Sequence, residues 1–312
     1  VGFAASTFVP QVQIISNWFV KRRGFAMGVS NSAQGFAAIL NLAVPVLIGF
    51  IGWRNSYTVL AGFTLIVAFP FAALLLRDHP HEKNTVPDAP FLSAGERAAL
   101  VEESEEAATG APVDSGFAHR VLSLHFALIG ATYGAIAFVF VGTVVHIVPL
   151  ATDQGFTPGG SAVIFLLWGL CILGANLISG ISDRFGRAPT YALGAAAGIA
   201  ACVLLATFVE GMPPGLFYMG AALSGLSLGL TRPTASALLA DHFAGPGFGM
   251  VNGSVMLIFA LFGAAGAYTT GFLFDAAESY RNAFLLLAAA HLAGAVFAVS
   301  LGRMKRIGTE LS

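Results

Sequence analysis

Long, continuous runs of apolar residues alternate with short polar joints along this 312-residue chain. A helix needs about 20 apolar residues to cross the hydrocarbon core of a membrane. Nine runs qualify, at roughly residues 1–20, 24–51, 56–76, 121–150, 159–182, 189–209, 214–240, 247–273 and 282–302. Membrane β-strands would instead show alternating segments of about ten residues. The pattern therefore predicts an all-α membrane protein with about nine transmembrane helices.

Turn-forming residues occupy the joints between these runs. The clearest joints are Gly52-Trp53-Arg54-Asn55, Asp153-Gln154-Gly155, Met212-Pro213-Pro214-Gly215 and Gly245-Pro246-Gly247. We expect the chain to change direction at each of them.

The composition agrees with a membrane setting. Hydrophobic residues make up 56% of the chain and charged residues 10%, with a mean hydropathy of +0.80, whereas soluble domains carry roughly 25% charged residues. The net charge of −1 and the lack of a basic tail exclude a nucleic-acid partner. Cys171 and Cys202 both lie in apolar runs, which excludes a disulfide framework or a cysteine metal site. We expect a monomer in the lipid bilayer, without cofactor or metal.

The basic residues gather on one side of the predicted topology. If Lys21 is placed in the cytoplasm, twelve of the fifteen Lys and Arg residues fall on that side. Only Arg54 and Arg281 fall on the other side, and Arg232 lies within a span. Positive residues favour the cytoplasmic side of a membrane. We therefore expect a multi-pass protein of the cell inner (plasma) membrane with a cytoplasmic C-terminus.

One long polar segment, about residues 77–118, separates three predicted spans from six. It holds nine acidic and three basic residues, and Ser93 with Glu96 predicts a capped short helix through about Ala107. A solvated surface explains its acidic run most simply, and a regulatory docking site is the alternative. Six spans after a central loop indicate a two-halved transporter whose first half lacks its three opening helices, since the chain begins at Val1. The expected regions are the remainder of the N-terminal bundle (1–76), the cytoplasmic loop (77–118), a C-terminal six-helix bundle (119–303) and a cytoplasmic tail (304–312).

Three segments carry a family resemblance. Asn17–Gly28 contains Lys21-Arg22-Arg23, Ser179–Arg187 reads S-G-I-S-D-R-F-G-R, and Gly225–Asp275 is rich in glycine. The chain resembles the major facilitator superfamily, in particular bacterial monocarboxylate porters and oxalate/formate-type antiporters. The second segment is similar to the superfamily's G-x-x-x-D-R-x-G-R loop, with Ser179 in the place of the first glycine. The resemblance implies a two-bundle helical transporter of twelve helices, about nine of them present here, with the substrate bound midway.

The same resemblance implies that these loops act in gating. Asp183 can accept N–H bonds from the start of a neighbouring helix, and the arginines beside it can pair with acids or lipid phosphates. A latch of the outward-open state and simple control of topology by positive charge are the two explanations. The residues assigned to these motifs are Lys21, Arg22, Arg23, Gly28, Gly180, Asp183, Arg184, Gly186 and Arg187.

Polar side chains inside spans usually face the bundle interior. In the run 24–51, four such residues fall within roughly 100° of one another on a helix, which indicates either a cavity wall or hydrogen bonds between helices. The candidate substrate-binding residues over all spans are Asn31, Gln34, Asn41, His125, Tyr133, Asn176 and Arg232.

Arg232 is the only basic residue well inside a span. Its partner can be a substrate anion, an acid in helices outside this chain, or water and lipid phosphate reached by snorkelling. The following Pro233 frees a backbone carbonyl one turn back, which would loosen the helix.

We expect secondary active transport of a small organic solute by alternating access. A carboxylate-type anion is the preferred solute, with either a co-transported proton or a counter-transported anion. No charged residue lies between Asp153 and Asp183, where the resemblance to monocarboxylate porters would place an Asp and an Arg. Transport or export of a neutral metabolite or drug is therefore the alternative. A membrane-embedded enzyme is less favoured, because the histidines lie on different spans without metal-binding spacing. A non-transporting sensor is less favoured, because it would usually carry an appended soluble domain, which we do not expect from this sequence.

Overall fold

The computed structural model describes residues 8–40, 43–83, 85–89, 92, 93, 95, 117–245 and 247–304, and every regular element within them is a helix. Its elements are α2 (Phe8–Trp18), α3 (Arg23–Leu40), α4 (Val44–Phe63), the π-helical turn η2 (Thr64–Ala68), α5 (Phe69–Leu75), the 3-10 turn η3 (Pro80–Lys83), α7 (Phe117–Val121), α8 (Leu124–Asp153), α9 (Pro158–Ile178), α10 (Ile181–Phe185), α11 (Arg187–Thr207), α12 (Pro214–Phe243), α13 (Phe248–Ala277) and α14 (Arg281–Gly302).

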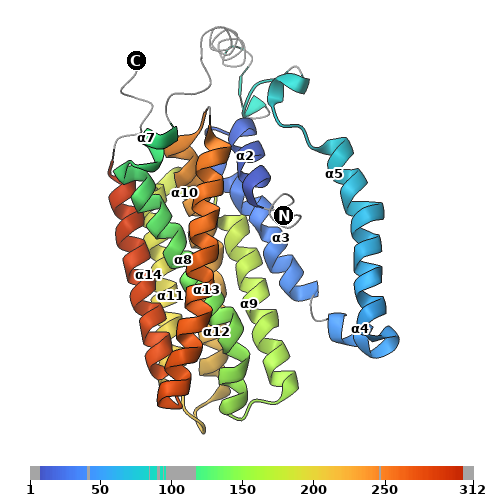
Figure 1. The fold of residues 1–312 in the computed structure, drawn as a ribbon, viewed down its shortest axis with the longest axis vertical. Coiled ribbons are helices and arrows are strands. Elements are labelled where there is room, and N and C mark those ends of the chain that lie inside the picture. The colour runs from blue at the N-terminus through green and yellow to red at the C-terminus, as the bar shows by residue number, and fades with distance from the viewer. Residues whose placement is uncertain are drawn as a thin grey trace.

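One elongated bundle is formed by the six long helices α8, α9, α11, α12, α13 and α14, as Figure 1 shows. In it α8 packs on α13 and α14, α11 packs on α12 and α14, and α9 packs on α12. Buried aliphatic and aromatic side chains fill the bundle, whereas Leu193, Tyr268, Leu292 and other large apolar side chains are exposed on its outside. An outer surface of this kind is suited to contact with lipid rather than water.

The local sequence sets where these helices begin. The hydroxyl of Ser123 accepts the N–H of Phe126 (3.1 Å) at the start of α8, and that of Thr157 accepts the N–H of Gly160 (3.2 Å) at the start of α9. Pro214 begins α12, at a position where the missing N–H of proline has no helical partner to lose. The six bundle helices begin and end within four residues of the predicted runs, so this part of the prediction is confirmed.

Six helical segments in the described ranges are long and apolar enough to cross a membrane. They are Val46–Leu74, Leu124–Asp153, Gly159–Ile178, Arg187–Thr207, Phe248–Ala277 and Arg281–Arg303. These segments support the helical membrane fold, but the predicted count of nine spans is not confirmed. α12 is 30 residues long, yet its glycines, hydroxyl side chains and Arg232 make it less apolar than its neighbours.

The predicted run 24–51 does not form one helix. α3 ends at Leu40, and α4 begins at Val44 with Pro45 in its first turn. Proline lacks an N–H and disfavours helix at the residue before it, so α3 cannot continue through this point. The chain bends again at Gly52 (φ 75°, ψ 160°), within the predicted joint. Beyond it, α4, η2 and α5 stand beside the bundle (Figure 1) and pack chiefly against one another.

The central loop is tied to the turn between α2 and α3. One carboxylate oxygen of Asp88 accepts the N–H groups of Val20 (2.8 Å) and Lys21 (2.7 Å). Most of the short helix predicted from Ser93 and Glu96, from residue 96 onward, lies outside the described residues.

Small residues allow α3 to approach the bundle closely. α3 packs along α9 and also contacts α12 and α10. A side chain at Gly28 would overlap the hydroxyl of Ser179 and the carbonyl oxygen of Asn176, and a Cβ at Gly35 would lie 2.6 Å from the backbone nitrogen of Leu173. Backbones that approach in this way gain dispersion contacts that are important between helices in lipid.

We predict that Gly28→Ala destabilises the protein, whereas Gly49→Ala does not. A methyl group at Gly28 overlaps α9, and overpacking of this kind costs about 1–3 kcal/mol. Gly49 is also helical, but a methyl group added there would have nothing within 4 Å, so alanine gains about 1 kcal/mol of helix propensity. Thermal unfolding of the detergent-purified variants, followed by tryptophan fluorescence, measures the difference. Equal melting temperatures for the two variants would contradict the close packing of α3 on α9.

Candidate functional site

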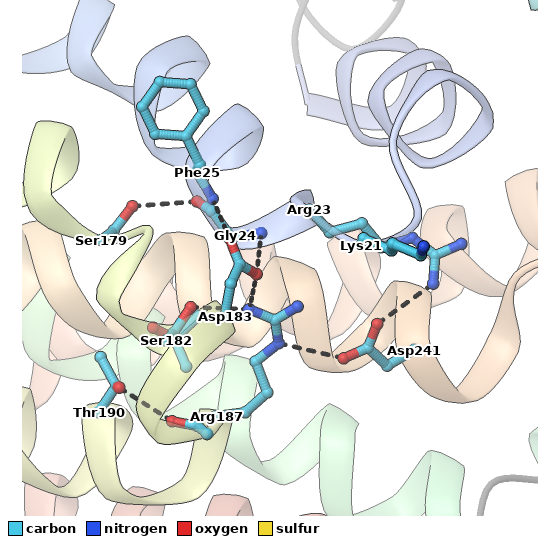
Figure 2. A network of polar contacts seen from close by, with 12 residues as sticks. Lys21, Arg23, Gly24, Phe25, Ser179, Ser182, Asp183, Arg187, Thr190 and Asp241 are labelled. Atoms are coloured by element: carbon cyan, nitrogen blue, oxygen red, sulfur yellow. Dashed lines mark hydrogen bonds and ion pairs between the residues drawn. The ribbon is translucent and has the colours of Figure 1, made fainter. Parts of the chain in front are cut away.

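Charged side chains from four helices meet where α3 begins, at the end of the bundle that we call the basic end (Figure 2). The charge network at this end comprises Arg23 of α3, Asp183 of α10, Arg187 of α11 and Asp241 of α12. Their side chains are largely buried, so water screens their interactions less than it does on an open surface.

Asp183 binds the first turn of α3. Its Oδ1 accepts the N–H of Gly24 and its Oδ2 accepts the N–H of Phe25, both at 2.9 Å. The first N–H groups of a helix have no partner within it, and the helix dipole places positive potential there. The prediction that Asp183 binds the start of a neighbouring helix is confirmed.

Arg187 connects Asp183 to a second carboxylate. Its Nη1 donates to Asp183 and to the hydroxyl of Ser182 (2.8 Å), while its Nε donates to Asp241 (3.1 Å). Arg23 donates from the other side to Asp241 at 3.2 Å. The network therefore sets two guanidinium groups against two carboxylates. Removal of one member would leave a largely buried charge without compensation.

Sequence reasoning missed Asp241 as a member of this network. Its partners Arg187 and Arg23 lie 54 and 218 residues away along the chain, so no local spacing reveals the contact. The sequence offered one signal for this contact. Asp241 is an acidic residue near the end of a predicted span, on the side of the membrane where the basic residues are expected.

The small residues of the loop motif allow the backbones of α9 and α10 to lie close to α3. The hydroxyl of Ser179 donates to the carbonyl of Gly24 at 3.1 Å, so serine in place of the family's glycine adds a bond between α9 and α3. A Cβ at Gly180 would lie 3.0 Å from the Cβ of Phe25. Gly186 adopts φ 95° between α10 and α11, a conformation that other residues rarely take.

Lys21, Arg22 and Arg184 lie beside the network rather than within it. All three are exposed and line an open pocket of about 610 Å³ that also contains Phe25 and Phe185. No ion pair of Arg184 is recorded among the described residues.

The structure brings two of the predicted substrate residues together deeper in the protein. Arg232 of α12 donates from Nη1 to the amide oxygen of Gln34 on α3 at 2.7 Å. Its guanidinium carbon lies 5.4 Å from the ring centre of Phe259 and 5.9 Å from that of Phe140, within the range of cation–π attraction. Arg232 is only 5% exposed. Snorkelling to a lipid phosphate, one of the three predicted arrangements, is therefore wrong.

Tyr133 belongs to the same region. Its hydroxyl donates to Ser236 (3.0 Å), whose own hydroxyl donates to the carbonyl of Arg232 (3.1 Å). The ring of Phe140 stacks on Trp168 with centres 6.2 Å apart. Residues from α3, α8 and α13 thus surround the guanidinium of Arg232, which α12 itself carries.

A small, mostly apolar cavity of about 30 Å³ lies next to this cluster. Phe140 lines the cavity and also lies beside the guanidinium of Arg232. Thr143, Ser227 and His291 contribute polar atoms to the cavity wall. The buried hydroxyl of Ser227 has no hydrogen-bond partner within the described parts of the chain. The cavity is large enough to hold water.

The other predicted substrate residues take different places. Asn176 donates to the backbone carbonyl of Asn31 at 3.0 Å, so this pair joins α9 to α3 as an interhelical bond. The ring of His125 lies 5.4 Å from that of His242. His125 is eight residues from Tyr133, about 12 Å along α8, so the structure does not bring it to Arg232. Asn41 lies outside the described residues.

The opposite end of the bundle carries a separate polar contact. The Nδ1 atom of His146 lies 3.3 Å from the hydroxyl of Tyr280. Burial raises the pKa of Tyr280, and the carboxylates of Asp153 and Asp275 raise it further. Within the described ranges, no group of three His, Cys, Asp or Glu side chains is placed to hold a metal ion.

Comparison with known proteins identifies similar sequences along the whole chain. The family model described as Major Facilitator Superfamily matches residues 1–211 and, in an overlapping match, 147–308. Monocarboxylate transporter 11 from Homo sapiens is 28% identical over 313 residues, which cover 97% of this chain and 61% of that protein. Monocarboxylate transporter 11 from Mus musculus is 28% identical over 307 residues, 96% of this chain and 64% of that protein. The chain thus spans about three fifths of the length of these curated relatives.

A solved structure has a similar fold. It is described as a Major Facilitator Superfamily (MFS) transporter, FucP, in the outward conformation. The TM-score is 0.53, and the match covers 96% of this chain and 92% of that chain at 15% sequence identity.

We predict that Asp183→Asn speeds amide exchange at the start of α3. The neutral amide side chain no longer compensates the helix dipole or Arg187, and hydrogen bonds to charged groups contribute about 1.5–3 kcal/mol. The amides of Gly24 and Phe25 should exchange roughly tenfold faster, because about 1.4 kcal/mol corresponds to a factor of ten. Hydrogen–deuterium exchange mass spectrometry of peptides covering residues 23–30 measures this. Glu210→Gln, which neutralises an exposed acid between α11 and α12, is the matched control. Indistinguishable exchange in the two variants would show that Asp183 does not stabilise this helix start.

Proposed function

Because this chain belongs to the Major Facilitator Superfamily, we propose that the protein is a secondary transporter that moves a small carboxylate-type anion across the membrane by alternating access. Family membership places it among transporters rather than among the membrane-embedded enzymes that the sequence left open. We further propose that residues 1–76 belong to one helical bundle and residues 119–303 to the other, joined by the loop 77–118 and followed by a tail at 304–312.

The observation that carries the choice of solute is the buried guanidinium of Arg232. An ionisable group buried inside a bundle of membrane helices is expensive and usually serves function. A guanidinium presents five N–H donors in a planar fork that matches a carboxylate. The contact of Arg232 with Gln34 places this fork between α12 and α3, the helices that we assign to opposite bundles. An anion bound there would contact both bundles at once.

The relatives support the same class of solute. Two of them are named Monocarboxylate transporter 11, and the aromatic rings of Phe140 and Phe259 beside Arg232 can pack on the carbon skeleton of an organic anion. A proton moving with the solute and an anion moving against it both remain compatible with this arrangement.

The charge network is suited to act as the gate at the basic end. Asp183 and its partners join α3 to α10, α11 and α12 through polar contacts, and each of these can be exchanged for water without breaking a covalent bond. We infer that the network closes the basic end in one state of the cycle and separates in the other. Polar interfaces suit such a switch, because two arrangements can differ by only a few kcal/mol.

We predict that Arg232→Lys weakens transport and that Arg232→Ala nearly abolishes it. Lysine keeps the charge but loses the fork, so the KM for a carboxylate should rise about tenfold. Uptake of labelled lactate by membrane vesicles that contain the full-length gene product measures this, with Arg54→Ala, an exposed arginine at the other end, as the control. Immunoblotting of the membranes checks that all variants are equally abundant.

Two results of this experiment would contradict the proposal. Unchanged lactate kinetics in Arg232→Ala would leave the anion site without its residue. Equal uptake of the neutral analogue lactamide by the unaltered protein would instead favour the alternative of a neutral-solute transporter.

We also propose that the basic end faces the cytoplasm. In a variant with Cys171 and Cys202 replaced by alanine, a cysteine at Thr85 should be shielded from an impermeant thiol reagent in intact cells. A cysteine at Met212, at the opposite end, should react. Labelling of the Thr85 position from outside would reverse the orientation.

A further inference from the structure

Two kinds of partner hold the guanidinium of Arg232. The rings of Phe140 on α8 and Phe259 on α13 lie 5.9 and 5.4 Å from its central carbon, and both helices belong to the same bundle as α12. The amide oxygen of Gln34 accepts a hydrogen bond from Nη1 at 2.7 Å. Gln34 comes from α3, which we assign to the other bundle. This contact therefore joins the two proposed bundles at the level of the proposed solute site.

Gln34 offers the guanidinium a neutral oxygen. A hydrogen bond is stronger when the acceptor is ionised as well as the donor, and a carboxylate can accept from two nitrogens of a guanidinium at once. A carboxylate that takes both terminal nitrogens of Arg232 needs Nη1, which is the atom that Gln34 occupies. An organic anion and Gln34 thus compete for the same donor, and the anion is the stronger acceptor.

Gln34 can give up this bond while α3 stays folded and docked. Gln34 is half-buried, whereas Arg232 is only 5% exposed, so the glutamine side chain has room to turn away. The first turn of α3 is bound by Asp183, and Asn176 donates to the backbone carbonyl of Asn31. Neither contact involves the side chain of Gln34. The exchange therefore needs the rotation of one side chain rather than the movement of a helix.

The neutral amide also suits the protein without solute. A buried charge is costly unless polar groups compensate it, and the oxygen of Gln34 supplies part of that compensation to Arg232. A glutamate at the same position would neutralise the guanidinium and compete with every incoming anion. Glutamine therefore stabilises Arg232 and leaves its charge available to a solute.

We propose that Gln34 regulates the solute site as an internal competitor: its amide oxygen occupies Nη1 of Arg232 in the empty protein, and the carboxylate of the solute displaces it. This inference rests on the proposed function, because it takes Arg232 as the anion site. A partner that occupies part of the molecules raises the apparent Kd of the anion. Displacement also removes a direct bond between α3 and α12, so a bound anion changes the contact between the proposed bundles.

Equilibrium binding of radiolabelled lactate to the detergent-purified full-length gene product tests the proposal. Gln34→Ala removes the competitor and should lower the Kd about tenfold, in line with the strength of a hydrogen bond to a charged group. Gln34→Glu should raise the Kd by at least about tenfold, because a tethered carboxylate acts on Arg232 at a high effective concentration. A purely structural role of Gln34 would not produce opposite changes in these two variants.

Gln11→Ala is the matched control. Gln11 of α2 is also half-buried and donates to the hydroxyl of Ser30 on α3, so this variant loses a glutamine contact of the same helix away from Arg232. It should bind lactate as the unaltered protein does. Thermal unfolding of each purified variant checks that the fold persists.

The outcomes separate this inference from the proposed function. An unchanged or higher Kd in Gln34→Ala would overturn the competitor role, and so would lactate binding by Gln34→Glu at the unaltered affinity. Arg232→Ala is measured in the same assay. If it binds lactate as tightly as the unaltered protein, the anion site itself is wrong. If it loses binding while Gln34→Ala gains none, only the role of Gln34 is wrong.

Discussion

A helix that begins within an apolar assembly needs partners for its first N–H groups, and α3 finds them in Asp183. Both carboxylate oxygens of Asp183 accept N–H groups from the first turn of α3. Asp183 belongs to α10, 158 residues further along the chain, so the helix start is stabilised by a distant segment. This contact holds the start of α3 beside α10, and α3 packs along α9 from there.

The other charges near Asp183 keep this contact specific and reversible. Arg187 and Arg23 bring Asp241 into the same network, and two cations then balance two anions. A balanced network of this kind is stable when assembled, because no charge is left buried without a partner. The members of the network can also separate without exposing buried apolar side chains. This property suits an interface that we propose to open and close.

α3 connects the charge network to the site that we propose for the solute. Gly24 binds Asp183, Gly28 packs against α9, and Gln34 contacts Arg232. Gly24 and Gln34 lie ten positions apart, which is about 15 Å along the helix. A shift of α3 against α9 and α12 would therefore change the charge network and the surroundings of Arg232 together. This gives a physical route by which an anion at Arg232 and closure of the basic end can influence one another.

The sequence alone determined the helical membrane fold, the six bundle helices and the role of Asp183 as a partner for a helix start, because apolar run length, turn residues and local motifs are all encoded within short segments. It also marked Arg232 and Gln34 as unusual, since polar groups inside spans are rare. Only the tertiary structure decided which of these residues meet. Gln34 and Arg232 lie 198 residues apart, Asp241 pairs with arginines from two other helices, and the end of α3 at Leu40 changed which residues lie along one helix. Contacts between distant segments depend on how whole helices pack and rotate against one another. A single sequence shows which residues share a helix face, but it does not show which faces of two helices contact each other.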